Sequence, residues 1–92
     1  MSDAADYELV VAPPAARALA EGLPEAVATA VIEFLTTALV RERRVGKPLK
    51  RELTGVHSAR RGTYRVLYRI NDERREVIVL RIEHRSDVYR TR

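Results

Sequence analysis

Two stretches of the 92-residue sequence interleave arginine with tyrosine: HSARRGTYRVLYR at residues 57–69 and HRSDVYR at residues 84–90. Arginine carries a planar fork of donors that matches the oxygens of a phosphate group, and it keeps its proton at any ordinary pH. Within predicted strands, this pattern has two interpretations, a solvated strand face or a surface that holds a phosphate. Which of the two interpretations applies depends on how the predicted strands and helices position these residues.

The charge of the chain is divided unevenly along its length. Residues 1–40 contain one basic and six acidic residues, a balance of −5, whereas residues 41–92 contain sixteen basic and seven acidic residues, a balance of +9, which together give +4. Only two of the basic residues in the second part are lysines. An arginine-rich half favours a polyanion or an acidic protein as partner. The alternative, a basic domain that has no such partner, is favoured almost as strongly.

Length and composition limit the possible functions. Ninety-two residues predict a single domain, residues 1–92, with one core. The absence of cysteine rules out disulfides and thiolate zinc sites, two histidines fit no usual zinc spacing, and no glycine-rich phosphate loop is present. We therefore expect neither a metal nor a small-molecule cofactor. With no run of eighteen apolar residues and an acidic start, MSDAADYE, we also expect no membrane segment or signal peptide, and a cytoplasmic location.

The first half of the sequence predicts a strand followed by a helical hairpin. Tyr7–Ala12 is rich in β-formers and ends at two prolines, so a helix is expected from about Pro14 to near Gly22. Pro24 then opens a second helix of roughly four turns. Its apolar residues recur with a helical period and form one stripe: Val27, Val31, Phe34, Leu35, Ala38 and Leu39.

The second half predicts a meander of three antiparallel strands. RERRVGKPLKREL, residues 41–53, is a charged segment that we expect to run along the surface as a connector. Strands are expected at Val56–Arg61, Thr63–Ile70 and Glu76–Glu83, with turns at Arg61-Gly62 and around Asn71-Asp72-Glu73. The predicted fold class is α+β, with the helices packed on one face of the sheet.

Strand alternation predicts which residues face the helices. In the middle strand, one face carries Tyr64, Val66, Tyr68 and Ile70, and the other carries Arg65, Leu67 and Arg69. In the last strand, Ile78, Leu80 and Ile82 alternate with Val77, Val79 and Arg81. We expect the tyrosine and isoleucine faces to pack on the helices, which leaves an arginine-bearing face on the other side.

With this order of elements, the chain resembles the RelE/ParE superfamily of toxins of type II toxin-antitoxin systems, and its RelE-like branch in particular. Three pieces carry the resemblance: PPAARALAEGLPEAV, RRGTYRVLYRI and HRSDVYR. RelE-type toxins are ribosome-dependent endoribonucleases that cut mRNA in the decoding site, and a partner antitoxin neutralises them. The resemblance thus implies a RelB-like antitoxin, the ribosome and mRNA as partners.

Two other functions remain open at this point. ParE-type toxins share the fold but poison DNA gyrase and are not nucleases. A basic RNA-binding module without catalysis would bind RNA with a steep salt dependence and would not be toxic.

RNA cleavage by the neighbouring 2′-hydroxyl without a metal requires a base, cationic donors for the phosphorane and an acid for the leaving 5′-oxygen. The resemblance makes Arg65 catalytic, and strand alternation places it away from the core. Arg85 and Tyr89 match an arginine and a tyrosine that RelE-type nucleases place at the scissile phosphate. Histidine is the side chain suited to proton transfer near neutrality, which makes His84 a candidate acid or base. The alternatives are a solvated arginine, a tyrosine packed at the sheet edge and a structural histidine.

The sequence departs from the RelE pattern in the first meander strand. Many RelE-type nucleases carry lysines there, one of them as a base, whereas this chain has Ser58. Arg60 is expected to keep the phosphate contact, and His57 is expected to be a packing substitute for a larger residue. The full set of predicted RNA or phosphate contacts is Arg60, Arg61, Lys47, Lys50, Arg51 and Arg81.

Overall fold

The computed structural model describes residues 7–50 and 54–84. Within them the predicted order of strand, helical hairpin and antiparallel strands is confirmed, and the fold is α+β. The elements are β1 (Glu8–Val11), α1 (Pro13–Arg17), its π-helical continuation η2 (Ala18–Gly22), α2 (Glu25–Glu33), its π-helical continuation η3 (Phe34–Leu39), β2 (Lys47–Pro48), β3 (His57–Arg61), β4 (Tyr64–Asn71) and β5 (Glu76–His84).

The strands form one five-stranded sheet in the order β1-β5-β4-β3-β2. β1 runs parallel to β5, and every other pair is antiparallel. Parallel neighbours need a long crossover, which the helical hairpin begins. The edge strand β2 was not predicted, because the connector carries no alternating pattern and proline is tolerated only where no ladder donor is needed.

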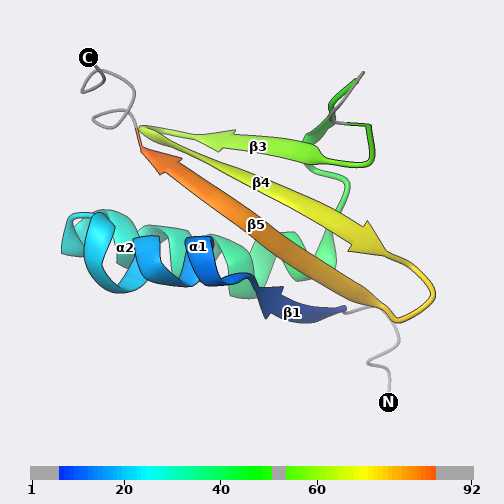
Figure 1. Cartoon of the computed structure of the whole chain (residues 1–92), viewed down its shortest axis with the longest axis horizontal. Coiled ribbons are helices and arrows are strands. Elements are labelled where there is room, and N and C mark those ends of the chain that lie inside the picture. Colours follow the sequence, from blue (N-terminus) through cyan, green and yellow to red (C-terminus); the bar gives the residue numbers. More distant parts are fainter. Residues whose placement is uncertain (1–6, 51–53, 85–92) are drawn as a thin grey trace.

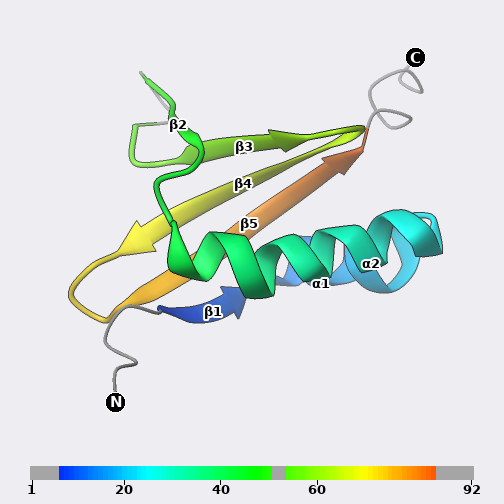
Figure 2. The same cartoon turned by 180° about the vertical axis from the view of Figure 1, so that it is seen from behind.

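The two helices lie side by side on one face of the sheet, as Figures 1 and 2 show from opposite sides. Pro24 has extended backbone angles and separates them. The predicted apolar stripe is confirmed, since Val31, Phe34, Leu35 and Leu39 are buried and Val27 and Ala38 pack against the same core.

The second helix widens into π-helical geometry at Phe34. The hydroxyl of Thr36 donates to the carbonyl of Ile32 at 2.8 Å, and that of Thr37 donates to the carbonyl of Glu33 at 2.6 Å. Such side-chain bonds compete with the backbone ladder for the carbonyl oxygens and disturb regular helix geometry.

The sheet contributes the other half of the core, and here one prediction is wrong. Tyr64, Val66 and Tyr68 are buried as expected. In β5, however, the buried residues before the strand's irregularity are Val77 and Val79, whereas Ile78 and Leu80 are only half-buried.

A β-bulge explains why the last residues of β5 nevertheless face the sides of the sheet that were predicted for them. Tyr68 is opposite Val79, whereas Leu67, the preceding residue of β4, is opposite Arg81, so Leu80 has no partner in the register. One extra residue moves all later side chains to the other face. Ile82 is therefore buried and Arg81 is exposed, as predicted.

Within residues 7–50 and 54–84, no helix is long and apolar enough to cross a bilayer.

Candidate functional site

The sheet face turned away from the helices, here called the outer face, carries basic residues from four strands. Directly opposite partners share a face, and their Cβ atoms lie about 4.5–5.5 Å apart in antiparallel pairs. Arg60 of β3 is opposite Arg65 of β4, which is opposite Glu83 of β5. These three residues form a row across the sheet, near the end where β5 finishes (Figure 1).

A second row lies beside the first. It runs through Lys47 of β2, Ser58 of β3, Leu67 of β4 and Arg81 of β5. Lys47, Arg60 and Arg81 are exposed, and Arg65 is half-buried. The structure thus brings three of the predicted phosphate contacts and the predicted catalytic Arg65 onto one face, where their combined charge attracts an anion.

Arg65 is paired with a carboxylate that sequence reasoning did not single out. Its Nη2 donates to Glu83 Oε1 at 2.6 Å, and its Nε donates to the same oxygen at 3.2 Å. The side chains are 39% and 28% exposed, respectively. That Glu83 lies opposite Arg65 follows only from the strand register, because the bulge at Leu80 determines which residue of β5 is paired with Arg65.

Arg61 and Lys50 lie away from the outer-face rows. Neighbouring residues of a strand point to opposite faces, so Arg61 lies on the helix side of the sheet. Its guanidinium carbon is 4.7 Å from the centre of the Phe34 ring, within range for a cation–π contact. Lys50 is exposed in the connector beyond β2.

The two histidines are both on the helix side of the sheet. His84 is opposite Tyr64, and its Nε2 lies 3.2 Å from the hydroxyl of Thr63, within hydrogen-bond distance. His57 stacks on Tyr68 with ring centroids 5.4 Å apart and planes 24° apart, in agreement with the predicted packing role. Burial, and then the charge of Arg44, lower the pKa of His57 below its ordinary value of 6.5.

Arg51, Arg85 and Tyr89 lie outside the residues that the structure describes. Arg85 follows directly after the last residue of β5. Among the described residues, no group of three His, Asp or Glu side chains is placed to hold a metal ion.

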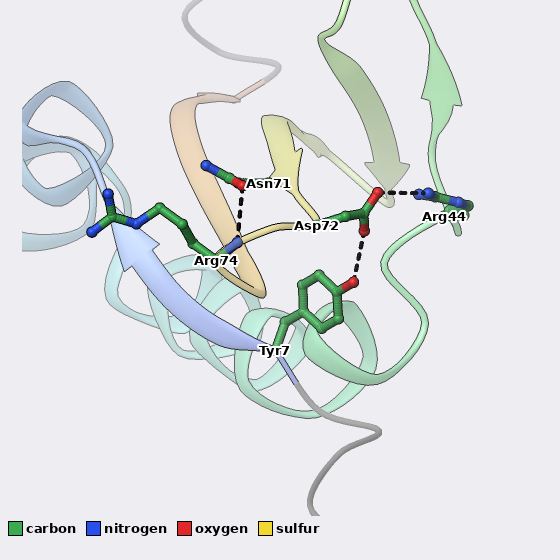
Figure 3. A network of polar contacts seen from close by, with 5 residues as sticks. All are labelled: Tyr7, Arg44, Asn71, Asp72 and Arg74. Atoms are coloured by element: carbon green, nitrogen blue, oxygen red, sulfur yellow. Dashed lines mark hydrogen bonds and ion pairs between the residues drawn. The ribbon is translucent and has the colours of Figure 1, made fainter.

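A separate polar network lies at the β4–β5 turn, at the other end of the sheet (Figure 3). The Tyr7 hydroxyl donates to Asp72 Oδ1 at 2.6 Å, and Arg44 Nη2 donates to Asp72 Oδ2 at 3.2 Å. The bond from Tyr7, and then the charges of Arg44 and Arg43, hold the pKa of Asp72 below its ordinary value. Arg43 also lies over the Tyr7 ring, 3.8 Å from its centre. The network ties β1, the connector and the β4–β5 turn together.

Comparison with known proteins identifies the class. A family model described as "ParE toxin of type II toxin-antitoxin system, parDE" matches residues 9–89. Toxin RelE of Mycobacterium tuberculosis is 45% identical over 91 residues, which cover 98% of this chain and 93% of that protein. The chain therefore belongs to the RelE/ParE family of toxins, as the sequence motifs predicted.

Other relatives are also similar to this chain over most of its length. Toxin RelG of the same organism is 59% identical over 69 residues, which cover 74% of this chain and 79% of that protein. The toxin-antitoxin complex RelBE2 of M. tuberculosis contains a chain that is 52% identical, with a TM-score of 0.83 over 87% of this chain and 99% of that chain. The archaeal RelE-RelB complex of Pyrococcus horikoshii contains one that is 29% identical, with a TM-score of 0.67 over 87% of this chain and 96% of that chain. The fold is the RelE-like fold.

Proposed function

We propose that the protein is a ribosome-dependent mRNA endoribonuclease, the toxin of a type II toxin-antitoxin system, which inhibits translation. The observation that carries this proposal is the alignment of Arg60, Arg65 and Arg81 on the outer face by the strand register. A cluster of arginines on a sheet face that none of the described helices covers is suited to bind the phosphodiester backbone of an RNA strand. The 45% identity to a protein named toxin RelE favours RNA over other polyanions.

The proposed reaction needs no metal. The ribose 2′-oxygen loses its proton to a base and attacks the adjacent phosphorus, the P–O5′ bond breaks, and the 5′-oxygen takes a proton from an acid. The products are a 2′,3′-cyclic phosphate and a 5′-hydroxyl end. Arg65 and Arg60 serve as donors to the phosphorane oxygens, where preorganised charge lowers the barrier. Arg85 and Tyr89 keep their proposed roles from the sequence, with Tyr89 as the acid. His84 receives no role in the proposed reaction, because it lies on the helix side of the sheet.

The partners follow from the same surface. Solved relatives include a RelBE2 complex and a RelE-RelB complex. A RelB-like antitoxin with an acidic or amphipathic segment could cover the outer face and so exclude RNA. Lys47 and Lys50, together with Arg51, would contact ribosomal RNA and place the protein in the decoding site.

A translation reaction tests this proposal. Purified protein is added to ribosomes translating a defined message, and primer extension maps any new ends. We expect cleavage at the decoding codon, a loss of at least about 100-fold in rate for Arg65→Ala, as for removal of one transition-state donor, and a large loss for Arg85→Ala. Arg69→Ala is the matched control, because Arg69 lies on the same face of the same strand, two positions beyond the second row. Equal rate losses for Arg65→Ala and Arg69→Ala would show that both substitutions act through the overall positive charge of the outer face. That result would contradict a catalytic role for Arg65.

The second candidate is a ParE-like poison of DNA gyrase. It is favoured by the family model, whose description names ParE, and by Ser58 in place of a basic residue. A protein of this kind would leave translated mRNA intact and would inhibit supercoiling by purified gyrase. That pair of results would overturn the nuclease proposal.

A further inference from the structure

The proposed reaction needs a group that can accept the 2′-hydroxyl proton near Arg65. Ser58 lies in the neighbouring row, but a serine hydroxyl is not a base at neutral pH. His57 is stacked on the core side against Tyr68, and its Nδ1 is buried without a hydrogen-bond partner. His84 is opposite Tyr64 and directed to the same side of the sheet.

Glu83 is the one remaining candidate in the described part of these two rows. It lies in the same row as Arg60 and Arg65, and its side chain is 28% exposed on the outer face. The other outer-face carboxylates of the described strands belong to Glu8 and Glu76, which are opposite each other beside the β4–β5 turn, at the far end of the sheet. They are too distant to serve a phosphate held by Arg65.

The geometry of the ion pair leaves Glu83 able to react. Both hydrogen bonds from Arg65 end on Oε1, so Oε2 receives neither of them. A guanidinium has five N–H donors, and since two are used here, three remain for phosphate oxygens. One carboxylate oxygen and part of one guanidinium are thus open on the same side of the sheet, next to each other.

We propose that Glu83 is the general base of the cleavage reaction, which it performs through Oε2 while Oε1 orients Arg65. This inference rests on the proposed endoribonuclease function. The 2′-hydroxyl proton moves to Glu83 Oε2 as the 2′-oxygen bonds to phosphorus, and the P–O5′ bond breaks. The 5′-oxygen takes its proton from the general acid of the proposed reaction, and Glu83 returns its proton to solvent after product release. Arg65 donates to the phosphorane beside the same carboxylate.

The arrangement also explains how the chain can act without a lysine at Ser58. A carboxylate supplies the base, and the arginine that it holds supplies the positive charge that a lysine would have added. The ion pair therefore has a role beyond stability, because it fixes base and phosphate donor in one geometry before RNA binds.

Glu83→Gln separates this role from simple positioning. Glutamine keeps a carbonyl oxygen that can accept both bonds from Arg65, but it cannot take a proton at neutral pH. We expect single-turnover cleavage on programmed ribosomes to fall at least about 100-fold, the contribution typical of a general base. Binding to ribosomes and to the antitoxin should stay within about threefold of the unmodified protein, because a partly exposed ion pair contributes little binding energy. Glu76→Gln, on the same face of the same strand, is the matched control and should cleave normally.

The pH dependence of the rate provides a second measurement. A base held by the protein removes the proton without hydroxide, so the cleavage rate of the unmodified protein should depend less on pH than that of Glu83→Gln between about pH 6.5 and 8.5. Without the base, hydroxide must remove the proton, and the Glu83→Gln rate should rise about tenfold per pH unit.

Three results would overturn the inference, and they are distinguishable. If the unmodified protein does not cleave mRNA, the proposed function fails and the base assignment fails with it. If the unmodified protein and Glu83→Gln cleave alike, only the base assignment fails, and Glu83 merely positions Arg65. If Glu83→Gln does not fold, the pH profile of the unmodified protein decides, since a tenfold rise per pH unit would exclude a carboxylate base.

Discussion

The hydroxyl of Tyr68 donates a hydrogen bond to the backbone carbonyl of Arg43 at 2.7 Å. The same hydroxyl accepts a bond from the backbone N–H of Gly46 at 3.0 Å. Tyr68 is the largest fully buried side chain among the described residues, so the connector between η3 and β2 is fastened to the centre of the core. Through this contact the core determines where Lys47 and the edge of the outer face lie.

Tyr68→Phe should destabilise the protein by about 1–3 kcal/mol, because the ring still fills the core but two part-buried backbone groups lose their partner. Urea denaturation followed by circular dichroism measures the change in the free energy of unfolding. Tyr7→Phe is the control, because it removes an exposed hydroxyl bonded to Asp72 and should have a smaller effect. Equal effects of the two substitutions would show that the connector is not held by Tyr68.

Gly46→Ala tests the same contact from the connector side. A Cβ at this position would lie 2.7 Å from the carbonyl oxygen of Ser58 and 2.8 Å from the Tyr68 hydroxyl. Because one of these atoms is backbone, β2 must move away from β3, at a cost of about 1–3 kcal/mol, as for other overpacked sites. Gly22→Ala should be neutral or slightly stabilising, since the atom nearest to a Cβ at that position, the Cβ of Ala18, would be 4.0 Å away. Thermal unfolding of both variants measures the difference, and similar melting temperatures would contradict the close packing at Gly46.

His57 should make the stability of the protein fall in mild acid. Burial and the charge of Arg44 lower its pKa in the folded state below the unfolded value of 6.5, so the unfolded state binds the proton more readily. The contribution of neutral His57 to the free energy of unfolding is fully present above the pKa of the unfolded state. It is lost as the pH falls through the pKa of the folded state. His57→Phe, which keeps the stacking on Tyr68, should flatten that part of the curve. The measurement is urea unfolding at a series of pH values from about 5 to 8, and an unchanged slope in the variant would contradict this account.

Much of the fold could be predicted from local sequence patterns. The stripe from Val27 to Leu39 repeats with a helical period, and the alternation from Tyr64 to Tyr68 has period two, so both buried faces were predicted correctly. Local patterns do not report strand pairing. The parallel contact of β1 with β5 and the two-residue strand β2 depend on contacts between segments far apart in the chain, and were not predicted.

The candidate site was only partly predictable, for the same reason. Strand alternation alone placed Arg65 away from the core. The bulge at Leu80 is not visible in a sequence in which Ile78, Leu80 and Ile82 alternate regularly, yet it decides which residue of β5 lies opposite Arg65. The pairing with Glu83 therefore needed the structure. The roles of Arg85 and Tyr89 remain predictions from the family resemblance, outside the described residues.

The Arg65–Glu83 pair should contribute little to stability by itself, and the two single substitutions should differ. A double-mutant cycle of Arg65→Ala and Glu83→Ala should give a coupling energy of about 0.2–1 kcal/mol, because both side chains are partly exposed to solvent. Glu83→Ala should cost more than Arg65→Ala. It leaves Arg65 directly opposite Arg60 without a compensating carboxylate, whereas Arg65→Ala removes that repulsion together with the ion pair.

The dependence on salt concentration tests whether the larger cost of Glu83→Ala comes from repulsion between the two arginines. Added salt screens repulsion between exposed charges, so the excess cost of Glu83→Ala should shrink as ionic strength rises. Unfolding free energies of the four proteins, measured in urea at low and high salt, give both the coupling energy and its screening. An Arg65→Ala variant that is less stable than Glu83→Ala at low salt would show that packing of the arginine, and not charge, dominates this row. In that case Arg65 would be held in place by its contacts with the sheet, and its orientation toward RNA would not depend on Glu83.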